Sequence, residues 1–237
     1  MISQRINKVL STSGICSRRK VDALIKDKKI TVNGSFAVIG MRVNPAIDRI
    51  FINGKELEKL NKKSEIILLN KPKNVLTTCS DRHHRVTVID LLPEHYKKGF
   101  FPIGRLDFLS RGALLITNDG EICYKLTHPK FEHKKTYIVK IYGALKNKDL
   151  ETWRSGVYLD EKKTSACEIK LIKKEKTSFI LKITLREGKN RQIRRIASLF
   201  GYKVIDLQRI NFANISLGNL KEGDWKVISN MHFKNSQ

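Results

Sequence analysis

One carboxylate in the sequence is well placed for chemistry. Asp107 lies between Arg105 and Arg111, just before a short apolar run that a turn closes at residues 118–120. If the backbone here is extended, Arg105 and Asp107 project from the same face, because side chains alternate along a strand. A cation that close favours the ionised carboxylate. A surface ion pair is the ordinary explanation for such an aspartate, so the pair alone does not assign it a role.

A second motif is basic and occupies residues 186–201. Apolar residues recur there at the spacing of one helix face, at Ile193, Ile196, Ala197 and Phe200. Three arginines fall on the other side of this predicted helix, Arg191, Arg194 and Arg195, and Gly201 follows as its C-terminal stop. On charge alone, a solvated basic face is as good an explanation as a binding face.

The third candidate is an aromatic residue in a predicted strand. Residues 134–143 alternate, so that Tyr137, Val139 and Ile141 share one face. On this pattern alone, Tyr137 is an ordinary core tyrosine.

Charge gives the strongest compositional signal. The chain has 47 Lys and Arg against 23 Asp and Glu, a formal net charge of +24. Such an excess indicates a polyanionic partner, either nucleic acid or an acidic membrane surface. There is no apolar run of membrane-spanning length and no signal-peptide pattern. Membrane binding is therefore favoured by net charge alone, and we expect no membrane partner.

Cysteine and histidine spacing gives no metal or disulfide pattern. The four cysteines, Cys16, Cys79, Cys123 and Cys167, lie 44 or more residues apart, which suits reduced thiols in a cytoplasmic protein. His83 and His84, with Cys79 and His95, match no zinc spacing. We expect a polar loop there, facing RNA or solvent, and no metal.

The N-terminal region predicts two short helices followed by small strands. Residues 4–13 have helical spacing, and Ser17 is a candidate N-cap for the second helix. The first turn of that helix holds Arg18, Arg19 and Lys20, and cations there oppose the helix dipole. A bound phosphate would remove the conflict, although a solvated basic turn is an equal alternative. Asn-Gly pairs after residues 30–32 and 50–52 predict hairpins.

Together these motifs resemble those of RNA pseudouridine synthases, in the branch named after RsuA and RluB. Residues 104–112 have the catalytic pattern Gly-Arg-Leu-Asp, two residues, Ser, one residue, Gly. The family's Asn-Lys-Pro is present at 70–72, its Lys-Thr-Tyr at 135–137 and its Gly-x-Asn-Arg-Gln-Ile-Arg-Arg at 188–195. Residues 3–55 resemble the RNA-binding module first described in ribosomal protein S-four.

The resemblance implies conversion of a uridine in structured RNA to pseudouridine, without metal, nucleotide or redox cofactor. It makes Asp107 the catalytic carboxylate, places Tyr137 against the target base, and pairs Arg194 with Asp107. Arg105 would be inserted where the base leaves its stack. The other RNA-binding candidates are Arg18, Arg19, Lys20, Arg191 and Arg195. Whether Asp107 attacks the sugar or abstracts a ribose proton stays open.

We therefore expect an α+β protein of two domains: an S-four-like RNA-binding domain at 1–60 and a catalytic domain at 61–237. Residues 56–65 read as the linker. The catalytic domain should have a mostly antiparallel mixed sheet with flanking helices, and a cleft lined by residues 104–110, 137 and 191–195. The expected protein is a cytoplasmic monomer acting on ribosomal RNA, and the wording of residues 188–195 is nearer the large-subunit branch. Two alternatives stay open: a non-catalytic ribosome-assembly factor, and a glycosylase that releases the base.

Overall fold

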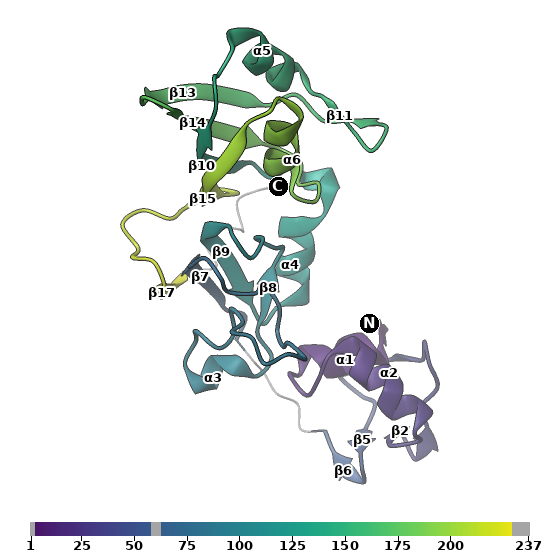
Figure 1. The fold of residues 1–237 in the computed structure, drawn as a ribbon. Coiled ribbons are helices and arrows are strands. Elements are labelled where there is room, and N and C mark those ends of the chain that lie inside the picture. The colour runs from purple at the N-terminus through teal and green to yellow at the C-terminus, as the bar shows by residue number, and fades with distance from the viewer. Residues whose placement is uncertain (1–2, 58–62, 229–237) are drawn as a thin grey trace.

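The N-terminal part of the chain forms a small unit at one end of an elongated molecule in the computed structural model, which describes residues 3–57 and 63–228 (Figure 1). Its elements are β1 (Gln4–Arg5), α1 (Ile6–Thr12), α2 (Arg18–Lys26), β2 (Ile30–Val32), β3 (Ser35–Phe36), β4 (Arg42–Val43), β5 (Ile50–Ile52) and β6 (Lys55–Glu56). Strands β3-β2-β5-β6 form one sheet and β1-β4 another. Both helices share a core with the strands, centred on Ile6, Leu10, Val21 and Ile30.

The local signals in this unit are confirmed. Each Asn-Gly pair joins two antiparallel strands, β2 to β3 and β5 to β6, with both of its residues at positive φ. This is the conformation that a type I′ hairpin turn requires. Ser17 caps α2, accepting a hydrogen bond from the Lys20 amide at 3.3 Å.

A nine-stranded sheet organises the second unit. Seven strands follow the order β13-β14-β10-β15-β9-β7-β17, while β16 pairs with β15 and β8 with β9. The bounds are β7 (Ile66–Lys71), β8 (Phe101–Ile103), β9 (Arg111–Thr117), β10 (Lys135–Tyr142), β13 (Glu168–Lys174), β14 (Ser178–Leu185), β15 (Lys203–Phe212), β16 (Ile215–Ser216) and β17 (Trp225–Ile228). Every pairing is antiparallel except β9 with β15. The predicted α+β class, with a mostly antiparallel mixed sheet, is confirmed.

Strands β7 and β9 separate two hydrophobic cores. Ile67, Leu69, Leu114 and Ile116 face the larger core, whereas Ile66, Leu68 and Leu115 belong to the smaller one. Strands covered on both faces have continuous apolar sequences, which explains why both segments lack alternating polar residues.

Short helices flank this sheet. They are α3 (Glu94–Lys97), α4 (Gly120–Thr127), the 3-10 turn η1 (Pro129–Phe131), α5 (Asn147–Ser155) and α6 (Gln192–Leu199), and a hairpin of β11 (Tyr158–Leu159) and β12 (Lys162–Lys163) follows α5. Asp119 is the N-cap of α4, accepting from the amide of Glu121 at 2.7 Å. No helix in the described parts of the chain is long and apolar enough to cross a bilayer.

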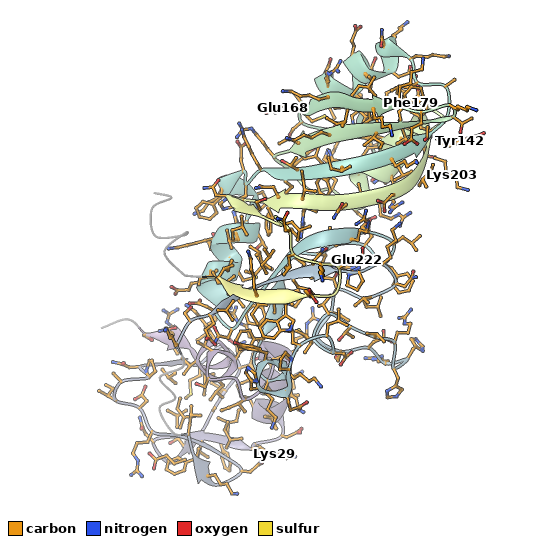
Figure 2. All side chains as sticks on the ribbon, turned by 90° about the vertical axis from the view of Figure 1, so that its left-hand side faces the viewer. Lys29, Tyr142, Glu168, Phe179, Lys203 and Glu222 are labelled. Carbon is orange, nitrogen blue, oxygen red and sulfur yellow. The ribbon has the colours of Figure 1, made fainter. Side chains whose placement is uncertain are left out.

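The two units touch through α4. Lys8 forms an ion pair with Glu121 at 3.1 Å, and the Arg18 guanidinium lies beside Gly120. The expected boundary at residues 60 and 61 lies outside the described residues. Figure 2 shows Lys29 of the first unit and Tyr142 of the sheet at opposite ends of the molecule.

Candidate active site

Asp107 lies in the turn between β8 and β9, and neighbouring segments hold the backbone of that turn. The Thr77 hydroxyl donates to the Leu106 carbonyl at 2.7 Å. The Asn74 amide donates to the Phe108 carbonyl at 2.8 Å. Because carbonyls on both sides of Asp107 are occupied, the turn has little freedom to shift.

Lys71, at the end of β7, also holds the backbone of the Asp107 turn. This side chain is fully buried, and its Nζ donates to the carbonyls of Pro72 at 2.9 Å, Asp107 at 3.3 Å and Ser110 at 2.9 Å. Burial lowers the pKa of Lys71 to about 8, although the nearby charge of Asp107 acts to raise it. A buried ammonium that donates three hydrogen bonds is costly to place and sets the geometry around it.

Gly112 explains a further position of the motif. Its φ is +106°, and an added Cβ would lie 2.2 Å from the carbonyl oxygen of Arg209. That approach occurs where β9 pairs in parallel with β15, Gly112 opposite Arg209. Only glycine fits here, because both its conformation and the space exclude a side chain.

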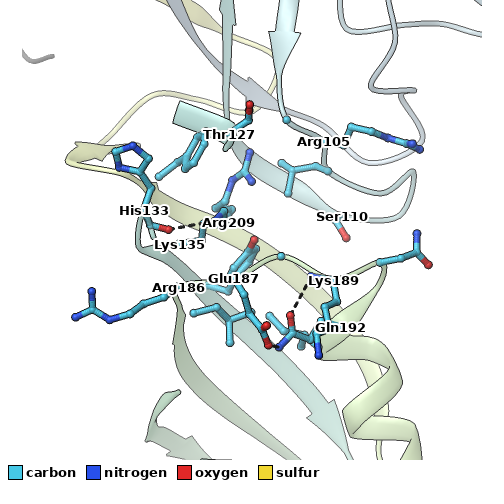
Figure 3. Close-up of a pocket in the computed structure, with 18 of the residues that line it drawn as sticks. Arg105, Ser110, Thr127, His133, Lys135, Arg186, Glu187, Lys189, Gln192 and Arg209 are labelled. Atoms are coloured by element: carbon cyan, nitrogen blue, oxygen red, sulfur yellow. Dashed lines mark hydrogen bonds between the residues drawn. The ribbon is translucent and has the colours of Figure 1, made fainter. Parts of the chain in front are cut away.

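The turn opens onto a cavity of about 770 Å³, a size typical of ligand sites (Figure 3). Of the predicted site residues, Arg105, Asp107, Tyr137 and Arg191 line it. Basic groups prevail in the lining: Arg105, His128, His133, Lys135, Arg186, Lys189, Arg191 and Arg209, against Asp107, Glu132 and Glu187. The cavity therefore suits an anionic, partly apolar ligand, with Asp107 among its lining residues.

Tyr137 stands on β10 directly across from Arg209 of β15. Its side chain is 9% exposed, and it lines the cavity as well as closing the larger core. Tyr137 and Arg209 are thus neighbours on the cavity wall, since directly opposed residues of a sheet share a face.

Arg194 reaches the Asp107 turn without lining the cavity. Its Nη2 donates to the Leu109 carbonyl at 3.0 Å, and its Nε is buried without a partner. Burial and then Arg191 lower the pKa of Arg194, while the charge of Asp107 acts to raise it. Within the described residues the two side chains form no ion pair, so Arg194 contacts the backbone of the turn. Its predicted pairing with Asp107 stays a prediction.

The other two arginines of the basic motif at 186–201 have different surroundings. The helix α6 begins at Gln192, so Arg191 is its N-cap residue and has a φ of +48°. Arg195 forms an ion pair with Asp160 at 2.5 Å, in the β11–β12 hairpin. The expectation that Arg191 shares a helix face with Arg194 and Arg195 is therefore wrong, although those two both lie within α6.

Arg111 also departs from the sequence interpretation. It pairs with Asp206 at 2.7 Å and with Glu222 at 3.4 Å, away from Asp107. Burial acts to raise the pKa of Asp206, but hydrogen bonds from Arg111 and Lys73 outweigh it and lower that pKa to about 2. Arg111 therefore ties β9 to β15 instead of flanking Asp107.

Three site residues had no role in the sequence interpretation: Lys71, Gln192 and Arg209. Lys71 was present in the sequence as the lysine of Asn-Lys-Pro, and Gln192 belongs to the basic motif at 186–201. Gln192 is buried, accepts from the Lys189 amide at 3.1 Å and donates to Glu187 at 2.7 Å, which shapes the loop before α6 (Figure 3). Arg209 was given no role, because the neighbours that place it lie on β9 and β10.

Other predicted residues lie elsewhere. Arg18, Arg19 and Lys20 are exposed on the first turn of α2, which has no acidic residue. His83 and His84 are exposed in the loop after Cys79. Across residues 3–57 and 63–228, no three metal-ligand side chains are grouped to hold an ion.

Comparison with known proteins gives one family. The family model described as RNA pseudouridylate synthase matches residues 65–199, and that of the S4 domain matches residues 4–45. The chain is 38% identical to the ribosomal large subunit pseudouridine synthase B of Bacillus subtilis, over 95% of this chain and 92% of that protein. It is 34% identical to the dual-specificity RNA pseudouridine synthase RluF of Escherichia coli, over 96% of this chain and 76% of the other.

A solved structure supports the same fold. The crystal structure of a pseudouridylate synthase superposes with a TM-score of 0.71, covering 99% of this chain and 100% of the other at 21% identity. The extent of the family-model match and the identity to its relatives agree with the motif resemblance. The chain belongs to the RNA pseudouridylate synthase family and carries an S4 domain at its N-terminus.

Proposed function

We propose that this protein isomerises a specific uridine of ribosomal RNA, in the large subunit, to pseudouridine. The observation that carries the proposal is Asp107 at the edge of the cavity, on a turn fixed by Lys71, Asn74 and Thr77. The names of the relatives support ribosomal RNA as the substrate.

The proposed reaction needs a carboxylate positioned at the ribose and a site that holds the base. The bond from the ribose C1′ to N1 breaks, the base turns, and C1′ bonds to C5. The C5 proton is lost and N1 gains one, so the reaction is redox-neutral and we propose no cofactor. Asp107 faces the sugar as nucleophile or base, and Tyr137 holds the base. Arg105 occupies the gap in the RNA stack, which offsets part of the cost of extruding the nucleotide.

The N-terminal unit is proposed to hold the RNA in register. Arg18, Arg19 and Lys20 project from the start of α2 with no acid in that turn. The unit, assigned to residues 1–60, adds affinity, and residues 61–237 carry out the reaction. We propose that the protein acts as a monomer in the cytoplasm, where ribosomal RNA is assembled.

The test is to map pseudouridines in ribosomal RNA from cells that lack the protein. One uridine should stay unmodified, and the wild-type gene should restore it while Asp107→Asn should not. In vitro, Asp107→Asn should bind an rRNA transcript with a Kd within about threefold of wild type. An assembly factor would leave the modification map unchanged, and a glycosylase would release free uracil. Either result, or normal turnover by pure Asp107→Asn, would overturn the proposal.

A further inference from the structure

Two cations on the cavity wall lack a counterion. Arg209 is 2% exposed, and its Nε donates to the Ala113 carbonyl at 2.7 Å. Its Nη2 is buried and has no hydrogen-bond partner. Lys135 lies beside it, and its Nζ donates to the His133 carbonyl at 3.1 Å (Figure 3).

Both cations lie near the same aromatic ring. The Arg209 guanidinium lies 4.7 Å from the centroid of Phe212, and the Lys135 ammonium lies 5.8 Å from it. Burial, and then the charge of Arg209, lower the pKa of Lys135. The ring attracts each cation but cannot neutralise either, so their mutual repulsion persists.

The acid that acts on this pair does so without contact. Glu187 acts on Lys135 from a distance, and its carboxylate is held in place by hydrogen bonds from Gln192 at 2.7 Å and from the Ser165 amide at 2.9 Å. Within residues 3–57 and 63–228, neither cation forms an ion pair with a carboxylate within 4.0 Å. A buried charge without a counterion is destabilising, and an arriving anion would relieve that cost.

We propose that Arg209 and Lys135 form a subsite for a phosphodiester that adjoins the target uridine in the RNA strand. The inference rests on the proposed use of the cavity for an RNA nucleotide. Phosphates flank the ribose on both sides, so they are the anions nearest to a sugar that faces Asp107. A guanidinium and an ammonium together match phosphate oxygens, the first as a fork and the second as a point charge. The subsite fixes the ribose against Asp107 while Tyr137, next to Arg209, holds the base.

The test measures how the affinity for an rRNA transcript depends on KCl. Lys135→Met removes one charge and keeps the side-chain length. Its plot of log affinity against log salt should be flatter by about 0.7, the value for one phosphate contact on a single strand. Lys182→Met is the matched control. Lys182 is exposed on β14 and pairs across the sheet with Ile138 and Lys170, on the face away from Tyr137. Its slope should equal that of wild type.

Arg209 is tested by Arg209→Lys, which keeps the charge and should keep the slope while the Kd rises. If that variant fails to fold, Lys135→Met still decides the question. An unchanged slope for Lys135→Met overturns the subsite. So does a lower single-turnover rate with an unchanged slope, which would place the cations against the base. If the wild type forms no pseudouridine and Lys135→Met still flattens the slope, the proposed reaction fails and the phosphate subsite stands.

Discussion

Lys71 offers the sharpest test of how the Asp107 turn is positioned. In Lys71→Met the Pro72 and Ser110 carbonyls lose their donor, while the Asp107 carbonyl keeps the Ser110 amide at 3.0 Å. Two stranded carbonyls cost about 2–6 kcal/mol, at about 1–3 kcal/mol each. Against this, the variant no longer buries an ammonium. The pKa of Lys71 falls from 10.5 to about 8, and that shift corresponds to a cost of about 3 kcal/mol, at about 1.36 kcal/mol per pKa unit.

The two contributions nearly cancel, so the free energy of unfolding should change by no more than about 3 kcal/mol. The turn itself loses its anchor, and a displacement of about 1 Å at a reacting group costs about 100-fold in rate. We expect Lys71→Met to fold, to bind rRNA with a Kd near that of wild type, and to react about 100-fold more slowly in a single turnover. Lys73→Met is the control, because Lys73 pairs with Asp206 at 2.7 Å and does not touch the turn.

A pH profile adds an independent check. Between pH 8 and 10.5 the unfolded chain binds a proton at Lys71 that the folded chain has lost. The free energy of unfolding should therefore rise with pH across this window through Lys71, and Lys71→Met should lack that contribution. If folded Lys71→Met turned over at a rate within threefold of wild type, the positioning argument would be wrong.

Three further predictions follow from the site. Gly112→Ala should destabilise the fold by more than about 3 kcal/mol, seen as a lower midpoint in urea, since its Cβ would collide with the β15 backbone; a midpoint equal to wild type would refute the close approach. Arg194→Ala should lower the single-turnover rate at saturating RNA by more than Arg195→Ala does, because only Arg194 touches the Asp107 turn; equal losses would withdraw that distinction. A fragment of residues 61–237 should keep the circular dichroism spectrum of a folded domain but bind rRNA at least tenfold more weakly than the full chain. Undiminished affinity would contradict the RNA-binding role assigned to α2.

Local signals predicted much of the fold. Ser17, the two Asn-Gly turns and the apolar run of β9 each depend on a few neighbouring residues, so the sequence alone was enough to find them. Asp107 and Tyr137 were identified because their sequence motifs resemble those of the family. Both residues line the same cavity.

What the sequence could not provide depended on pairing between distant strands. Arg111 is adjacent to the Asp107 turn along the chain, yet its partner Asp206 lies 95 residues away. The arginines near 191–195 were assigned to one helix face, but α6 begins after Arg191. Arg209 gained its position only because β15 lies between β9 and β10. Such neighbours follow from strand order, which local periodicity does not encode.

The parallel ladder between β9 and β15 has a consequence for motion. It registers only Arg111 with Gln208 and Gly112 with Arg209, and it joins a half-sheet carrying the Asp107 turn to a half-sheet carrying Tyr137. Each half has longer antiparallel ladders of its own, so its amides should be better protected in hydrogen exchange than those of a two-pair ladder. Amides along this seam should then exchange sooner than those of β10 or β7. Because both halves also contribute to the larger core, side-chain packing as well as this short ladder keeps the Asp107 turn and Tyr137 together.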